Sequence, residues 1–267
     1  MDYLNYSNQL TKQINANIDT NQQGDIGGKS YNFGDLTCNS SQQQTNLPQQ
    51  QQQTNLQDEL IQLFPTPVLI SKYTANYDRE LDWILKQDID SEQNCINETM
   101  GVRFNRQSDD RYVLDKPELA NIRTFIEEKL QYYVTNMWGS KDRLIITQSW
   151  FNRNCRGERH HEHQHPNSMI SGVWYPKIHD KMPPIHFKKP LVRDVSMGVE
   201  KYTIFNSASF MIPMNKGELV LFPSNLPHSV QQNMTDEERI SLSFNTWPKG
   251  SLGSERELTY LPLDRCV

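Results

Sequence analysis

The stretch Glu218-Leu219-Val220-Leu221-Phe222-Pro223-Ser224-Asn225-Leu226-Pro227-His228 joins an apolar, strand-like run to a turn and a histidine. Short runs rich in β-branched or aromatic residues recur after residue 143, separated by Gly, Pro, Asn and Asp turn signals. We predict strands at residues 144–151, 170–175, 185–187, 202–205, 209–212, 218–222 and 239–247. This spacing predicts an antiparallel double sheet or barrel-like domain.

Two helices are predicted ahead of these strands. Residues 77–87 and, more strongly, residues 117–137 carry apolar side chains at helical spacing. We expect Asp115 to cap the second helix and Pro117 to lie in its first turn. The end of residues 63–70 predicts an early strand. The fold class is therefore expected to be mainly β with buttressing helices (α+β), with the helices on one face of the sheet.

Residues 1–60 differ in composition from the rest of the chain, because they include 13 Gln and 9 Asn. Such a segment buries too little apolar area to offset the entropy lost on ordering. We predict a disordered Gln/Asn-rich tail at residues 1–58 and one folded domain at residues 59–267. An assembly partner that orders the tail is the alternative.

Composition and charge restrict the partners and the location of the protein. A formal net charge of -5 gives no general attraction to nucleic acid or anionic membranes. No apolar run approaches the roughly 20 residues that span a bilayer, and the N-terminus lacks the features of a secretory signal. The four cysteines are scattered without paired spacing, which favours a reducing compartment. We therefore expect a cytoplasmic protein.

Four of the seven histidines lie within residues 160–165. Neutral imidazole is a common metal ligand, and residues i and i+2 of a strand point the same way. His163 and His165 can therefore offer two nitrogens to one ion, with His228 as the third ligand and further coordination positions left open. The alternatives are a solvated His-rich loop with adventitious metal affinity and, with no cysteine nearby, the less favoured structural zinc site.

Arg239 begins a strand-like run in which it shares one face with Ser241 and Ser243. If Ile240 and the other apolar residues of the run face a core, Arg239 must face a polar group. A guanidinium beside a hydroxyl binds carboxylates well. The alternative is an ordinary ion pair with a surface glutamate.

Together these motifs resemble the iron(II)/2-oxoglutarate-dependent oxygenases. They are the His-x-His pair, Ser171-Gly172-Val173-Trp174-Tyr175, the run from Gly217 to Ser224 with His228 beyond it, and Arg239-x-Ser241. The order resembles most a prolyl-hydroxylase-like branch that is common in tailed bacteriophages, over about residues 63–247. The resemblance implies a double-stranded β-helix (jelly roll) and, if the chain is phage-encoded, the host cytoplasm as its location.

The resemblance also implies roles for individual residues. His163 and His228 would bind iron(II), and Arg239 would bind the C5 carboxylate of 2-oxoglutarate with help from Ser241 and Tyr175. Asn152 is a weaker candidate for the keto-acid end, with an ordinary strand amide as the alternative. His165 would be the third ligand.

The sequence departs from the family at His165. Most of the superfamily has Asp or Glu there, so the iron site of this chain would be more positive by one charge. Glu162, Asn167 or a remote Asp could replace His165 as the ligand.

The implied reaction uses O2, releases succinate and CO2, and hydroxylates an unidentified prime substrate, either a protein side chain or a small molecule. Two other functions remain open at the level of sequence. One is a three-histidine cupin-type dioxygenase that needs no 2-oxoglutarate, although such an enzyme has no use for the Arg239-x-Ser241 pair. The other is a non-enzymatic jelly roll with a virion or assembly role, tethered by the Gln-rich tail.

Overall fold

The long strand β12 (Arg239–Pro248) separates two environments. Its apolar residues Ile240, Leu242 and Phe244 are fully buried in the main hydrophobic core, as the alternation of the sequence predicts. The intervening residues Arg239, Ser241 and Ser243 are also buried and point to the opposite face. The computed structural model describes residues 64–89, 96–97, 102–190 and 198–263, so the predicted tail at residues 1–58 lies outside the described residues.

Two six-stranded sheets form the domain. The major sheet has the order β1-β10-β7-β12-β5-β4 and is antiparallel throughout. Its remaining strands are β1 (Leu69–Lys72), β4 (Arg106–Gln107), β5 (Leu144–Asn154), β7 (Ile170–Lys177) and β10 (Glu218–Pro223).

The minor sheet has the order β2-β3-β6-β11-β8-β9, and its β3–β6 pair is parallel. Its strands are β2 (Ile96–Asn97), β3 (Val102–Phe104), β6 (Glu158–His163), β8 (Ile185–Lys188), β9 (Ser209–Ile212) and β11 (His228–Val230). A second core cluster joins the sheets, with Tyr175 and Phe222 from the major sheet packed with Phe187 from the minor sheet. This arrangement confirms the predicted jelly roll.

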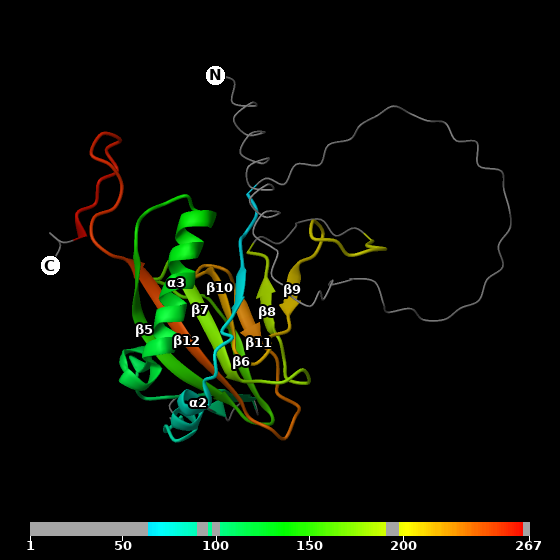
Figure 1. Ribbon diagram of the computed structural model, residues 1–267. Coiled ribbons are helices and arrows are strands. Elements are labelled where there is room, and N and C mark those ends of the chain that lie inside the picture. Colours follow the sequence, from blue (N-terminus) through cyan, green and yellow to red (C-terminus); the bar gives the residue numbers. More distant parts are fainter. Residues whose placement is uncertain (1–63, 90–95, 98–101, 191–197, 264–267) are drawn as a thin grey trace, which may run out of the picture. The chain divides into compact units, whose positions relative to one another are not determined.

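Helices α2 (Asp78–Leu85) and α3 (Ala120–Met137) cover the outer face of the major sheet (Figure 1). Helix α3 buries Ile122, Ile126 and Leu130 in the same core cluster as Leu242 and Phe244 of β12. The predicted helix-on-sheet core is therefore confirmed. Within the described residues, none of the helices combines the length and the apolar character needed to cross a membrane.

The start of α3 differs from the prediction. Pro117 begins a 3-10 turn (Pro117–Leu119), and α3 follows with Leu119 at its N-cap and no side-chain cap. Asp115 ends the preceding 3-10 turn and pairs with Arg123, so its predicted role as the cap is wrong. The ion pair satisfies the carboxylate in place of the helix N-terminus.

Six of the seven predicted strands after residue 143 form as β5, β7, β8, β9, β10 and β12. The seventh, at residues 202–205, is wrong, because Thr203 and Asn206 form a polar turn there. The side chain of Asn206 accepts from the Thr203 amide at 2.7 Å and donates to the Lys201 carbonyl at 2.8 Å. Side chain–backbone bonds of this kind compete with strand pairing.

Gly172 on β7 lies where the packing leaves no room for a side chain. A Cβ there would lie 2.2 Å from Phe244 Cζ and 2.7 Å from Leu221 Cδ2. Gly172→Ala is therefore expected to overpack the core and lower the free energy of unfolding by about 1–3 kcal/mol. Urea unfolding followed by circular dichroism measures the change.

Gly198→Ala is the matched control, because a Cβ at Gly198 meets no atom within 4 Å. It should change stability by no more than about 0.5 kcal/mol. Equal stability of both variants would contradict the close packing of β7 against β12.

Candidate active site

A β-bulge turns the histidine-rich strand β6 toward the interior. His228 of β11 pairs with His163, whereas Val230, two residues on, pairs with His160, three residues back. The extra residue of β6 places His160 and His163 on the same side of the strand. Their rings stack with centroids 4.4 Å apart, while His161 is exposed.

His163, His165 and His228 converge. One ring nitrogen from each lies within 4.8 Å of the other two, and these residues form a possible metal-binding group within the described residues. The Nε2 atoms of His165 and His228 are 3.2 Å apart. His165 lies two residues beyond the end of β6, where its backbone N–H donates to the Ser224 carbonyl at 2.9 Å. The sequence-based prediction that these three rings meet is therefore consistent with the geometry.

Backbone carbonyls orient two of the three rings. Nδ1 of His163 lies 2.8 Å from the His161 carbonyl oxygen, and Nδ1 of His228 lies 2.9 Å from that of Leu226. A neutral ring with a proton on Nδ1 donates to the carbonyl and leaves a lone pair on Nε2. Such orienting bonds are typical of metal-binding histidines.

Burial keeps these imidazoles neutral. It lowers the pKa of His165 to about 4 and that of His228 to about 3, and it lowers the pKa of His163, with neighbouring histidines adding to the effect in each case. All three rings therefore carry free lone pairs at neutral pH, which is the protonation state that a metal ion needs.

Arg239 lines the same cavity as the histidines, and only 2 % of its surface is exposed. Within the described part of the chain it has no acidic partner: its Nη1 donates to Asn154 Oδ1 at 3.2 Å and weakly to Ser241 Oγ at 3.5 Å. Its guanidinium lies 5.0 Å from the ring centroid of Tyr175. Burial lowers the pKa of Arg239, and the Tyr175 side chain opposes that shift.

Several buried polar atoms around Arg239 have no hydrogen-bond partner within the described residues. They are Arg239 Nε, Tyr175 Oη, Asn154 Nδ2 and Trp150 Nε1. Unpaired buried donors cost free energy. Three of these four residues, Arg239, Tyr175 and Trp150, line a cavity together with the three histidines and Ser241. The predicted ion pair of Arg239 with a surface glutamate is absent from the described residues, and an anionic ligand would satisfy this set.

Asn152 lines the same cavity, but its amide is already engaged. Its Nδ2 donates to Ser243 Oγ at 2.9 Å, and its Oδ1 accepts from Asn105 Nδ2 at 2.9 Å. This environment favours a structural amide over a cosubstrate contact. Of the other ligands considered at the third position, Glu162 pairs with Lys188 and Asn167 is exposed.

Sequence reasoning missed three residues of this cavity region: His160, Trp150 and Asn154. The position of His160 depends on the bulge in β6, which leaves no sequence signal. Trp150 and Asn154 alternate with Asn152 on β5, so the alternation that selected Asn152 could have found both.

Residues 148–245 match the family model described as "Putative 2OG-Fe(II) oxygenase". The matched residues contain all three converging histidines and Arg239. These residues are therefore similar to the iron(II)/2-oxoglutarate oxygenases. The match supports a 2-oxoglutarate-dependent oxygenase, with iron(II) as the metal and 2-oxoglutarate and O2 as the cosubstrates. The phage-associated branch stays a prediction.

Solved structures with a similar arrangement include three oxygenases. One is a 2OG-Fe(II) oxygenase family oxidoreductase from Burkholderia pseudomallei, with 11 % identity, coverage of 67 % of this chain and 83 % of that chain, and a TM-score of 0.48. Another is HygX from Streptomyces hygroscopicus with nickel and 2-oxoglutarate bound, with 10 % identity, coverage of 69 % of this chain and 84 % of that chain, and a TM-score of 0.46. The third is a prolyl-4-hydroxylase from Pseudomonas putida, with 14 % identity, coverage of 68 % of this chain and 94 % of that chain, and a TM-score of 0.45. No curated protein matches the sequence significantly. None of these likenesses bears on the prime substrate.

The metal-free protein is expected to lose stability as the pH falls from 7 to 5. Because burial lowers the pKa values of His165 and His228 below the ordinary 6.5, the unfolded chain takes up protons in this range and the folded chain does not. Stability from these groups is present above about pH 6.5 and is lost below it, by roughly 1–2 kcal/mol per histidine at pH 5. Urea unfolding at both pH values measures the loss.

His165→Gln should make this pH dependence shallower. His161→Gln, on the exposed side of the same strand, is the matched control and should leave it unchanged. An unchanged pH dependence in His165→Gln would show that His165 is not held neutral by burial.

Proposed function

We propose that His163, His165 and His228 bind iron(II), that Arg239, Ser241 and Tyr175 bind the C5 carboxylate of 2-oxoglutarate, and that the enzyme hydroxylates a protein side chain or a small molecule. The observation that carries the proposal is the buried guanidinium of Arg239. It has no acidic partner within the described residues, and it lines the same cavity as three converging imidazole nitrogens.

The three histidines fit iron(II) in number and in protonation state. Imidazole nitrogens suit this metal, and three ligands from one side leave positions free for a bidentate keto acid and O2. When bound, iron(II) with these cosubstrates supplies the oxidising power to insert one oxygen atom into a substrate C–H bond while 2-oxoglutarate becomes succinate and CO2.

The protein's own part is to position the metal and the cosubstrate and to exclude water. His163 and His228 are held by carbonyl oxygens, and His165 is held through the Ser224 carbonyl. The cavity extends from these rings past His160 to Arg239, between the two sheets. Its volume is about 20 Å³, so a dicarboxylate that spans from the three histidines to the guanidinium requires the lining side chains to move apart.

The end of the cavity at Arg239 has the donors that a carboxylate needs. Arg239 Nε and Tyr175 Oη are buried without partners, and Ser241 Oγ lies 3.5 Å from the guanidinium. Hydrogen bonds to charged groups contribute about 1.5–3 kcal/mol each, more than neutral pairs. The absence of a carboxylate among the three proposed metal ligands adds to the positive charge that a dianionic cosubstrate would meet.

Arg239→Ala is expected to weaken 2-oxoglutarate binding by about 10- to 150-fold, because it removes one charged hydrogen-bonding partner. Anaerobic calorimetric titration of 2-oxoglutarate into protein loaded with Mn(II), a redox-stable substitute for iron(II), measures the dissociation constant.

Arg156→Ala is the matched control, since Arg156 is exposed and pairs with Asp236 at the surface. It should bind 2-oxoglutarate as the wild type does. If Arg239→Ala also binds with unchanged affinity, Arg239 does not hold the cosubstrate and the proposal is wrong.

A further inference from the structure

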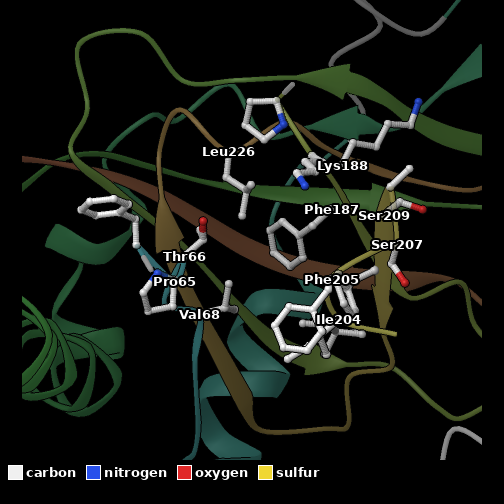
Figure 2. A pocket seen from close by; sticks show the side chains of 16 residues that line it. Pro65, Thr66, Val68, Phe187, Lys188, Ile204, Phe205, Ser207, Ser209 and Leu226 are labelled. Atoms are coloured by element: carbon white, nitrogen blue, oxygen red, sulfur yellow. The ribbon is translucent and has the colours of Figure 1, made fainter. Parts of the chain in front are cut away.

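A second and larger cavity, of about 610 Å³, lies at the open edge between the two sheets. Figure 2 shows Pro65, Thr66 and Val68 on one side of it and Ile204 and Phe205 on the other, with Phe187 between them. Leu226 also lines it. Its wall is largely apolar, and its volume greatly exceeds that of the cavity around the histidines and Arg239.

The register of the minor sheet connects this cavity to the proposed metal site. His163 pairs with His228, His228 pairs with Phe187, and Phe187 pairs with Phe210. Directly paired residues project from the same face of a sheet. These four side chains therefore form one row that runs from the histidines to the cavity wall. At strand spacings of 4.7–4.9 Å, Phe210 lies about 10 Å from His228.

Two of the residues that line the cavity also contact His228. The Phe187 ring lies 6.2 Å from the His228 ring, centroid to centroid, and the Leu226 carbonyl accepts from His228 Nδ1 at 2.9 Å. Any molecule that fills the cavity is therefore separated from the proposed metal ligands by one layer of side chains.

The cavity has an apolar rim that solvent reaches. Phe64 is 95 % exposed, Ile204 is 59 % exposed and Phe205 is 45 % exposed. Contiguous exposed apolar surface around a hollow is typical of a ligand site. Two cations line the cavity: Lys188 pairs with Glu162, and Lys189 is exposed to solvent.

We infer that this cavity binds the prime substrate, and that the substrate is a largely apolar small molecule. The inference rests on the proposed function, because it takes the three histidines as the metal site. A volume of about 610 Å³ lies within the range of small-molecule sites, roughly 300–1,000 Å³, and exceeds what one amino-acid side chain fills. The few hydroxyls in the wall, such as Thr66 and Ser209, can orient a polar group of the ligand.

The test uses 6-fluoroindole, a neutral apolar probe, with the full-length protein and saturating 2-oxoglutarate. Fluorine NMR measures its dissociation constant with Zn(II) bound, and its line width when Mn(II) replaces Zn(II). We expect binding with Zn(II) and at least several-fold broadening with Mn(II), because a paramagnetic ion about 10 Å away relaxes the nucleus strongly.

Two variants and one control locate the probe. Ile212→Trp fills the cavity, and Ile204→Asp makes its exposed rim polar without disturbing a buried residue. Each should raise the dissociation constant at least ten-fold. Met211→Trp, on the same strand as Ile212, is the matched control: Met211 is 48 % exposed and does not line the cavity, so affinity should stay unchanged.

The outcomes separate this inference from the proposed function. No binding of the probe, binding unaffected by both cavity variants, or binding without broadening by Mn(II) would each overturn the substrate pocket. If a second copy of the chain covers the cavity, the probe should not bind and light scattering should show a dimer. Failure of the protein to bind Mn(II) would instead contradict the proposed metal site. The affinities of the wild type and the variants for the probe, measured without Zn(II), would then test the pocket by themselves.

Discussion

Burial of the Arg239 guanidinium between two sheets is the constraint on which the site depends. Strand β12 places Ile240, Leu242 and Phe244 in the core under the helices, so the alternate residues must face the other sheet. A cation in that position costs free energy unless an anion accompanies it. No acidic side chain among the described residues pairs with Arg239, which leaves the anion to a ligand. The main core therefore stabilises a geometry that, under the proposed function, the cosubstrate completes.

The sequence predicts those features that depend on local alternation. The faces of β12, the helix-on-sheet core of α3 and six of the seven strands after residue 143 follow from periodicity, which the burial of each element confirms. The approach of His228 to His163 and His165 was inferred from spacing and residue type, and register brings these residues together. The face that each residue of a strand presents can therefore be derived from the sequence of that strand alone.

Features that depend on a partner element could not be predicted. The bulge that brings His160 beside His163 arises from pairing between β6 and β11. The residues 202–205 have strand-like composition, yet Asn206 satisfies the backbone there. Asp115 looked like a helix cap but pairs with Arg123, eight residues away. In each case, a strand pairing, hydrogen bond or ion pair decided between two locally acceptable conformations.

Under the proposed function, His165 determines the charge of the metal site. If it is a metal ligand, three neutral imidazoles leave the full charge of iron(II) to be balanced by the dianionic cosubstrate, with Arg239 adding a further positive charge. A carboxylate ligand would neutralise part of that charge before the cosubstrate arrived. Under the proposed function, the small cavity at Arg239 holds the cosubstrate and the larger cavity beside Phe187 holds a different molecule.

The most direct test of the central claim is the visible absorption of the anaerobic protein as iron(II) and then 2-oxoglutarate are added. A keto acid chelated to iron(II) gives a metal-to-ligand charge-transfer band. The account predicts a band that appears only when both are present, that succinate does not reproduce and that is lost in His228→Ala but kept in His161→Ala. No band at saturating iron(II) and 2-oxoglutarate would contradict a three-histidine iron site.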